Sequence, residues 1–416
     1  MYQYRFAFVL FVTMASSIVA RGFELAADDW PGWRGPGQTG IAAGPLPPTN
    51  WSESENIIWK ARLPGRGHSS PTVVGQHLYI ATADEIQRTQ SVICFQRSTG
   101  RKLWETVVHK DGLAKKMNKK ASHASSTVAC DGDRLFINFA NRGAVYTSAL
   151  SRDGQILWQT KISDYIIHQG YGSSPAIYKS LVLVSADNKG GGAIAGLNRK
   201  DGEIVWKADR PKMPNYASPV VVKVHGRDQL IFIGCEMVSS FDPATGAKLW
   251  EIEGATTECV TSTVTDGDLV FSSGGYPKNH VSAVRADGSG EIVWENNVRV
   301  YVPSMVLQGK YLYAVSDAGI AHCWKAASGE LIWRGRLGGD FTASLILVDG
   351  HLLATNEKGM SYVFKADPTK FELVDESKLG DKVLATPTVS GGRIYMRVVE
   401  VNNGKPQEIL YCIGEK

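Results

Sequence analysis

A short pattern that recurs along the chain constrains its fold more than any other feature. Glycine is followed four residues later by tryptophan six times, at Gly100/Trp104, Gly154/Trp158, Gly202/Trp206, Gly246/Trp250, Gly290/Trp294 and Gly329/Trp333. Glycine supplies the positive φ that a tight turn requires, and the apolar residues after it are typical of a strand with a buried face. The tryptophan offers a large apolar surface for packing against a neighbouring unit. We therefore predict a tandem repeat in which each unit docks on the next through its tryptophan.

Two independent sets of strand signals predict the same number of repeats. Eight inner strands each begin with Ser or Thr before an apolar run, at Ser70, Ser126, Ser174, Ser218, Ser262, Ser304, Ser344 and Thr386. Outer strands are predicted at the six Gly-x-x-x-Trp segments and at Phe371–Val374, a copy that lacks the tryptophan. The eighth outer strand, Asn56–Lys60 with Trp59, precedes the first inner strand.

The displaced eighth strand indicates how the array ends. The chain stops after a third strand of its last unit, Glu408–Ile413. We expect Asn56–Lys60 to pair there, which closes a ring and removes the free sheet edges. Eight units over residues 56–414 contain about 45 residues each, the size of a four-stranded blade. The predicted fold is all-β, an eight-bladed β-propeller whose last blade is completed by an N-terminal strand.

Residues 1–20 have the composition of a secretory signal peptide. Met1–Arg5 carries one positive charge, Phe6–Ala15 is nearly all apolar, and small residues follow up to Ala20. A membrane anchor is the alternative, for which the apolar stretch is short, and no later apolar run is long enough to span a bilayer. The first cysteine is Cys94, so no lipid-modified mature N-terminus is expected. We predict a periplasmic or secreted protein without a transmembrane segment.

Residues 21–55 form a zone rich in Trp, Pro and Gly, which excludes regular helix or central strand. We expect this segment to pack on the propeller, because two tryptophans gain little from exposure. Arg34 lies close enough in sequence to Trp30 and Trp33 for a cation–π contact. An aromatic platform for sugar binding is the alternative role of the two rings.

Charge and cysteine content exclude several function classes. With 45 Lys+Arg against 41 Asp+Glu, the net charge of +4 is too small to indicate a nucleic-acid partner. The basic group Lys115, Lys116, Lys119 and Lys120 is expected to be a solvated loop face, with attraction to an anionic partner as the alternative. The six cysteines allow 15 full pairings, and their apolar surroundings favour free, buried thiols. No cysteine spacing typical of zinc or haem sites occurs.

The repeats carry a family resemblance. A small residue, then Thr, Asp or Ser before Gly-x-x-x-Trp, resembles the tryptophan-docking repeat of quinoprotein-like propellers. That superfamily includes pyrroloquinoline quinone (PQQ) alcohol dehydrogenases and the propeller lipoprotein of the bacterial outer-membrane β-barrel assembly machine. The opening Trp30-Pro31-Gly32-Trp33-Arg34-Gly35-Pro36-Gly37 is similar to the start of secreted PQQ-like repeat proteins of planctomycete-type bacteria. The resemblance covers residues 56–414 and implies a fold, while the scaffold hosts several unrelated activities.

In such a propeller the loops that enter the inner strands meet at one mouth of the central channel. The loops supply His68, His123, His168, Tyr171, Asn215, Tyr216, Glu258, Tyr301, Phe341 and Asp381. Such His, Tyr and acidic groups suit a polar or glycan-like ligand, with aromatic rings for stacking. Loops are ordinarily polar, so a solvated rim is the alternative. Convergence of His68, His123 and His168 on zinc or copper is a further hypothesis without local ligand spacing, and we expect no metal.

These observations favour an exported, non-enzymatic propeller that serves as a binding or assembly scaffold for protein or polysaccharide, and we expect a monomer. A polysaccharide-acting hydrolase or lyase that uses His and Tyr at the mouth is the alternative. A PQQ-dependent dehydrogenase with calcium is disfavoured, because the chain lacks the vicinal cysteine pair and long inserted loops of that class. An outer-membrane assembly role is weakened by the missing lipidation cysteine.

Overall fold

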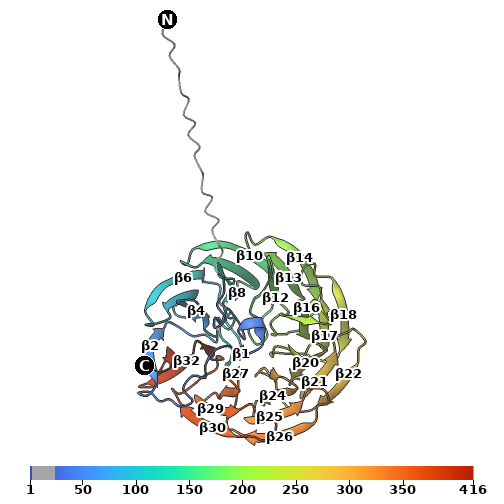
Figure 1. Cartoon of the computed structure of the whole chain (residues 1–416). Helices are drawn as coiled ribbons and strands as arrows, with labels where there is room; N and C mark the ends of the chain where they lie inside the picture. Colours follow the sequence, from blue (N-terminus) through green and yellow to red (C-terminus); the bar gives the residue numbers. More distant parts are fainter. Residues whose placement is uncertain (2–23, 416) are drawn as a thin grey trace.

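The structure is a computed structural model that describes Met1 and residues 24–415. The predicted signal segment 1–20 therefore lies, apart from Met1, outside the described residues. Figure 1 shows sheets arranged in sectors around a central axis, with the N-terminal segment in blue at the centre. The sheets number eight, which confirms the predicted eight-bladed β-propeller.

Blades 1 to 4 follow one another along the chain as antiparallel sheets. Blade 1 consists of β3 (Thr72–Val74), β4 (His77–Asp84), β5 (Thr89–Gln96) and β6 (Lys102–Lys110). Blade 2 consists of β7 (Ala129–Cys130), β8 (Arg134–Asn141), β9 (Ala144–Ser151) and β10 (Ile156–Asp164). Blade 3 consists of β11 (Ala176–Tyr178), β12 (Leu181–Ser185), β13 (Gly192–Asn198) and β14 (Ile204–Arg210). Blade 4 consists of β15 (Val220–Val224), β16 (Arg227–Gly234), β17 (Met237–Phe241) and β18 (Lys248–Glu253).

Blades 5 to 8 continue the ring, and the last two also take up N-terminal strands. Blade 5 consists of β19 (Val264–Thr265), β20 (Leu269–Gly274), β21 (His280–Arg285) and β22 (Ile292–Asn296). Blade 6 consists of β23 (Val306–Gln308), β24 (Tyr311–Val315), β25 (Ile320–Lys325) and β26 (Leu331–Arg336). Blade 7 consists of β27 (Ile346–Val348), β28 (His351–Thr355), β29 (Met360–Lys365) and β30 (Leu373–Lys378), joined by β1 (Ile41–Ala42). Blade 8 consists of β31 (Thr388–Ser390), β32 (Arg393–Asn402), β33 (Lys405–Ile413) and β2 (Ile57–Leu63).

Strand β2 closes the ring, as the sequence predicts. It pairs antiparallel with β33, in a register that runs from Ile57 opposite Ile413 to Leu63 opposite Glu408. In Figure 1, β2 lies beside the C-terminus at the edge of the ring. The last blade is thus built from both ends of the chain and leaves no unpaired end between blades 8 and 1.

The repeated tryptophans pack on the glycines of the following blade. Trp59 of blade 8 lies over Gly100 of blade 1, where an added Cβ would stand 2.4 Å from the Trp59 ring. The ring Nε1–H of Trp59 also donates to the backbone oxygen of Arg97, at 3.0 Å. The same packing and a hydrogen bond to a backbone oxygen of the next blade occur for Trp104, Trp158, Trp206 and Trp294.

Two boundaries depart from this pattern. Trp250 donates to Gln229 Oε1 of its own blade, at 2.9 Å. Trp333 Nε1–H still donates to a backbone oxygen of blade 7. Because blade 7 has no docking glycine, the Trp333 ring packs instead on Phe371, with the two ring centroids 5.5 Å apart. Blade 7 also lacks the tryptophan, and the N-terminal segment covers that position: Thr49 donates to Asp375, and the N–H of buried Trp51 donates to Ser377.

The Ser and Thr residues of the inner strands link neighbouring blades. At six boundaries the N–H of one residue donates to the hydroxyl of its counterpart, at 2.9–3.1 Å: Ser70–Thr127, Thr127–Ser174, Ser174–Ser218, Ser262–Ser304, Ser304–Ser344 and Ser344–Thr386. Between blades 4 and 5, the hydroxyl of Ser262 instead accepts from Trp33 Nε1, at 2.7 Å. These bonds satisfy buried polar groups around the axis, which would otherwise destabilise the centre of the ring.

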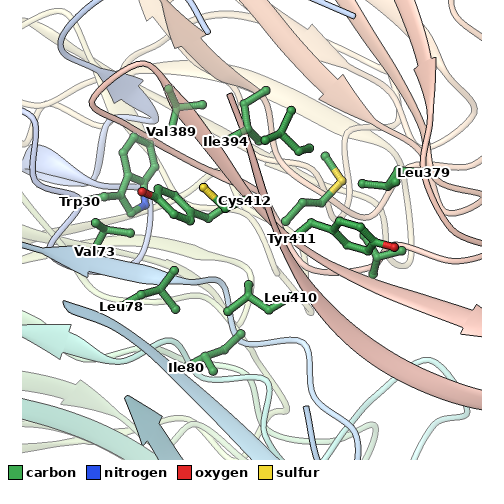
Figure 2. Packing of buried hydrophobic residues seen from close by; sticks show 14 of the residues in the cluster. Trp30, Val73, Leu78, Ile80, Leu379, Val389, Ile394, Leu410, Tyr411 and Cys412 are labelled. Atoms are coloured by element: carbon green, nitrogen blue, oxygen red, sulfur yellow. The ribbon is translucent and has the colours of Figure 1, made fainter. Parts of the chain in front are cut away.

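Residues 28–42, which include the short 3₁₀ turn η1 (Pro36–Gln38), occupy the centre of the ring as a plug (Figure 1). Besides Ser262 of blade 5, the plug makes hydrogen bonds to six other blades, through Val73, Cys130, Pro219, Met305, Leu347 and Ser390. Trp30 is only 1% exposed and belongs to the apolar cluster of blades 7, 8 and 1, part of which Figure 2 shows. Arg34, proposed above for a cation–π contact, donates to the backbone oxygens of Gln38, Thr39 and Met305.

All six cysteines are free and buried in the described chain. Burial raises the pKa of Cys94 to about 12 and that of Cys323 to about 11. These thiols therefore stay protonated near neutral pH and act as small apolar side chains. Within the described residues, no helix has the length and apolar character needed to cross a membrane.

The docking contact predicts a difference between two glycines that share a positive φ. Ala at Gly100 (φ 69°) would meet the Trp59 ring, whereas Ala at Gly309 (φ 57°) would meet nothing within 4 Å. Both substitutions carry the left-handed backbone cost of about 1–2 kcal/mol. We expect Gly100→Ala to lower the free energy of unfolding, measured in urea, by about 1–3 kcal/mol more than Gly309→Ala does, because overpacking usually costs that much. Equal losses for Gly100→Ala and Gly309→Ala would show that the ring does not depend on this contact.

Candidate functional site

A cavity with a volume of about 790 Å³ lies where the interblade loops converge on one mouth of the channel. Trp33 of the plug contributes to its lining, together with Ser174, Ser218 and Thr386 of the hydroxyl links. The plug fills the channel at the centre of the ring. The cavity therefore lies against the plug, through Trp33.

The structure brings most of the predicted mouth residues into this cavity. The lining includes His68, His168, Tyr171, Tyr216, Glu258, Tyr301 and Phe341. They come from loops 64–71, 165–175, 211–219, 254–263, 297–305 and 337–345, each of which enters an inner strand. Because these loops share one position in their blades, a search for loops that enter inner strands identifies residues that are far apart in sequence.

Three predicted mouth residues are placed elsewhere. The backbone oxygen of His123 accepts from Gln90 Nε2, at 2.7 Å, and its ring does not line the cavity. Asn215 is buried and joins Asp187 to the N–H of Cys259. The exposed side chain of Asp381 accepts from the N–H of Val401, at 2.7 Å. Loop position alone does not fix which way a side chain points.

The cavity also contains residues that were not predicted from the loops entering the inner strands. Asn118 and Lys120 come from the long loop 111–128, and Trp33 comes from the plug. Tyr276, Asp317 and Glu357 come from the turns between the second and third strands of blades 5, 6 and 7. In an antiparallel blade these turns open on the same face as the loop that enters the first strand. The Ser316–Gly319 and Asn356–Gly359 turns were therefore a readable signal for Asp317 and Glu357.

Glu258 is the most buried carboxylate of the cavity, with a side chain 5% exposed. Its Oε1 lies 3.2 Å from His168 Nε2, and its Oε2 accepts from the Tyr301 hydroxyl, at 3.2 Å. Its backbone pairs with that of Tyr276 through an isolated β-bridge. Loops of blades 2 to 6 thus fix one carboxylate between an imidazole and a phenol.

Two tyrosines beside Glu258 are held in their protonated form. Burial first, and then the negative charge of Glu258, raise the pKa of both Tyr216 and Tyr301 well above the usual range. The Tyr216 oxygen accepts from the N–H of Gln169, at 3.2 Å, which leaves its own proton available for donation. Both phenols therefore present hydrogen-bond donors near the carboxylate.

Two ion pairs line the remaining wall. Lys120 Nζ lies 2.8 Å from Glu357 Oε1 and thereby joins loop 111–128 to blade 7 across the mouth. Arg299 Nε lies 3.9 Å from Asp317 Oδ1, and its guanidinium lies over the Tyr301 ring at 5.0 Å. Burial raises the pKa of Asp317, although the Tyr301 N–H, 2.7 Å from Oδ2, opposes that shift.

His68 lies on the side of the cavity that faces blade 8. Its pKa is lowered well below the usual value by burial first, and then by the positive charges of Arg66, Arg397 and Lys382. Arg397 also forms a buried ion pair with Glu408. His68 is therefore a neutral imidazole at physiological pH, suited to hydrogen bonding rather than to charge pairing.

The lining does not fit a quinone cofactor of the PQQ type. PQQ carries three carboxylates, whereas the cavity contains four carboxylates and only two Lys or Arg side chains, each already paired. Among the described residues, no group of three or more His, Cys, Asp or Glu side chains is arranged to hold a metal ion.

Comparisons with known proteins agree with this architecture. The family model described as outer membrane protein assembly factor BamB matches residues 49–164, 88–278 and 277–370. A search of curated proteins found no match.

Three solved structures share the fold at low sequence identity. BamB from Moraxella catarrhalis is 13% identical, with a TM-score of 0.58 over 85% of this chain and 96% of that one. A europium-containing methanol dehydrogenase is 11% identical, with a TM-score of 0.63 over 94% of this chain and 98% of that one. The quinohemoprotein alcohol dehydrogenase ADHIIG from Pseudomonas putida HK5 is 10% identical, with a TM-score of 0.67 over 93% of this chain and 80% of that one. At these identities the likeness shows the fold alone.

The environment of His68 predicts its titration. We expect His68 to stay neutral at pH 6 in an NMR titration, because burial and the nearby cations disfavour its protonation. Arg66→Gln removes one positive charge and should raise the pKa of His68 toward its usual value. Arg62→Gln, at an exposed position of β2, serves as the control and should leave the titration unchanged. A wild-type midpoint near the usual histidine value would contradict this account.

Proposed function

Because the chain belongs to the PQQ-type propeller family described as outer membrane protein assembly factor BamB, we propose that it is an exported, non-enzymatic binding propeller of the cell envelope. Its ligand is a polysaccharide segment that enters the mouth cavity. The proposal rests mainly on one observation, the cavity of about 790 Å³ whose lining combines aromatic rings with carboxylates. A protein partner in the envelope is the alternative occupant, in keeping with the family's description as an assembly factor.

The lining suits the two kinds of surface that a sugar ring presents. Four aromatic side chains of the lining offer apolar surface for its C–H groups, Trp33, Tyr216, Tyr276 and Tyr301, while the buried Tyr171 and Phe341 support the wall from behind. Carboxylates accept hydrogen bonds from hydroxyl groups, and the protonated Tyr216 donates to ring or hydroxyl oxygens. Tyr276 is 55% exposed at the rim, where an entering chain would meet it first. A cavity with apolar walls and a few fixed polar groups is the usual form of a small-ligand site.

The plug supports a binding role over transport through the ring. It fills the channel at its centre and makes hydrogen bonds to seven blades. Its Trp33 lines the cavity while its Trp30 is buried between blades. A ligand in the mouth would therefore rest on a fixed floor, which lowers the ordering cost of binding.

A hydrolase or lyase acting on polysaccharide is the second candidate. It is favoured by the contacts of Glu258 with His168 and Tyr301, since a buried carboxylate beside an imidazole and a phenol is a plausible acid–base group. Release of reducing ends or of unsaturated products from the polysaccharide that binds best would support this candidate. Loss of that release in His168→Ala, with binding retained, would establish it over the scaffold role.

The binding role predicts affinity for oligosaccharides that depends on the rim aromatic. A glycan array followed by calorimetry should find a saccharide ligand, and Tyr276→Ala should weaken its binding about three- to tenfold, in line with the value of an aromatic contact. Tyr311→Ala, on β24 outside the cavity, is the matched control and should leave affinity unchanged. An array without saccharide binding would refute the proposed function.

A further inference from the structure

We propose that the saccharide taken by the cavity carries a protonated amine, which lies against Glu258. The ligand class is an amine-bearing, cationic saccharide rather than a neutral or acidic one. This inference rests on the proposed function and names the chemistry of the same site.

The charges of the lining point to a cationic ligand. Four carboxylates face the cavity, from Glu258, Asp317, Asp340 and Glu357, against the two cations Lys120 and Arg299. Lys120 pairs with Glu357, and Arg299 lies nearest to Asp317. Glu258 and Asp340 remain without a Lys or Arg partner among the described residues. Counting only Lys, Arg, Asp and Glu, the lining carries a net charge of −2, four carboxylates less two cations, whereas the whole chain carries +4 on the same count.

Glu258 retains the capacity to accept an ammonium group. Each of its oxygens has one partner at 3.2 Å, His168 Nε2 or the Tyr301 hydroxyl. An ionised carboxylate accepts about four hydrogen bonds, so about two remain for a ligand. Glu258 is only 4% exposed. At such a site an unpaired charge is costly, and a cationic ligand would offset that cost more fully than a neutral hydroxyl.

Aromatic rings around Glu258 favour the same ligand charge. Tyr216 and Tyr301 lie close enough for Glu258 to raise the pKa of each. One face of Tyr301 is already occupied by the Arg299 guanidinium, at 5.0 Å. Tyr216 and the half-exposed Tyr276, which pairs with Glu258 through its backbone, also line the cavity. Aromatic faces attract cations, with more strength where water is excluded.

Besides the paired Lys120 and Arg299 of the lining, two further positive groups lie on the side of the cavity away from Glu258. Arg66 and Lys382 act on His68, which belongs to the blade 8 side. Lys115, Lys116 and Lys119 belong to loop 111–128 but not to the lining. An amine would therefore avoid the His68 side and settle at Glu258, so the cavity imposes a direction on the saccharide.

Two oligosaccharides that differ only in charge test this inference. The β-1,4-linked glucosamine hexamer carries free amines, whereas the N-acetylglucosamine hexamer has the same length and linkage but no charge. Calorimetry at pH 6.5 with the full chain should show at least tenfold tighter binding of the glucosamine hexamer. Raising the salt concentration from 50 to 300 mM should reduce that preference, because it is electrostatic.

Substitutions distinguish the effect of the Glu258 carboxylate on binding from an effect on folding. Glu258→Gln should bring the ratio of the two affinities to within about twofold, and Asp340→Asn, at an exposed position, should lower the ratio less. Glu330→Gln, in an exposed ion pair with Lys325 outside the cavity, should leave the ratio unchanged. If Glu258→Gln does not fold, the response of Asp340→Asn still decides the matter.

Each outcome has one meaning. Equal binding of both hexamers, or tighter binding of the acetylated one, overturns the inference and leaves the proposed function standing. The same holds if neither hexamer binds while another saccharide does. A preference that survives in both Glu258→Gln and Asp340→Asn also overturns it. Absence of binding to any saccharide refutes the proposed function itself.

Discussion

The packing of a tryptophan ring on a glycine of the next blade is the contact on which the ring depends. A side chain on that glycine would stand about 2.3–2.8 Å from the ring at five of the boundaries, so each pair sets the spacing of two blades. The seam between blades 8 and 1 uses the same contact, Trp59 on Gly100, and closure is therefore one more copy of the repeat. Where blade 7 lacks the tryptophan, Thr49 and Trp51 of the N-terminal segment cover the position. The ring is thus completed at two places by residues that precede its first blade.

The N-terminal segment also forms part of the cavity. The inner strands are short, and their Ser and Thr hydroxyls are used in bonds between blades. The plug adds hydrogen bonds to seven blades and places Trp33 at the base of the cavity. Without it the channel would lack a floor, and the loops above would enclose an opening rather than a pocket. The same residues therefore stabilise the centre of the ring and shape the cavity.

The sequence predicted the ring better than the site, for a physical reason. Blade number followed from Gly-x-x-x-Trp and from residues such as Ser174 and Ser304, because docking and interblade bonding require these residue types at fixed positions. The mouth residues follow from loop position, which brought His168, Glu258 and Tyr301 together but did not place His123 or Asp381 in the cavity. Their side-chain directions depend on contacts such as that of Asp381 with Val401. A sugar-binding platform was the alternative role considered for Trp33, but the sequence did not place its ring in the cavity, since no pattern in residues 21–55 indicates a path through the channel.

The residues that differ between the blades at the mouth are not those that hold the blades together. Docking tryptophans and inner-strand hydroxyls are nearly the same in every blade, so they do not make one side of the mouth differ from the other. That difference comes from the loops and turns: Glu258, Asp317, Asp340 and Glu357 follow strands of blades 4 to 7, whereas Arg66 and Lys382 lie in the loops on either side of blade 8. Burial first, and then these charges, lower the pKa of His68 on one side and raise the pKa of Tyr216 and of Tyr301 on the other. A nearly symmetric fold thereby carries an asymmetric distribution of charge, and the proposed preference for a cationic saccharide rests on this distribution rather than on the fold.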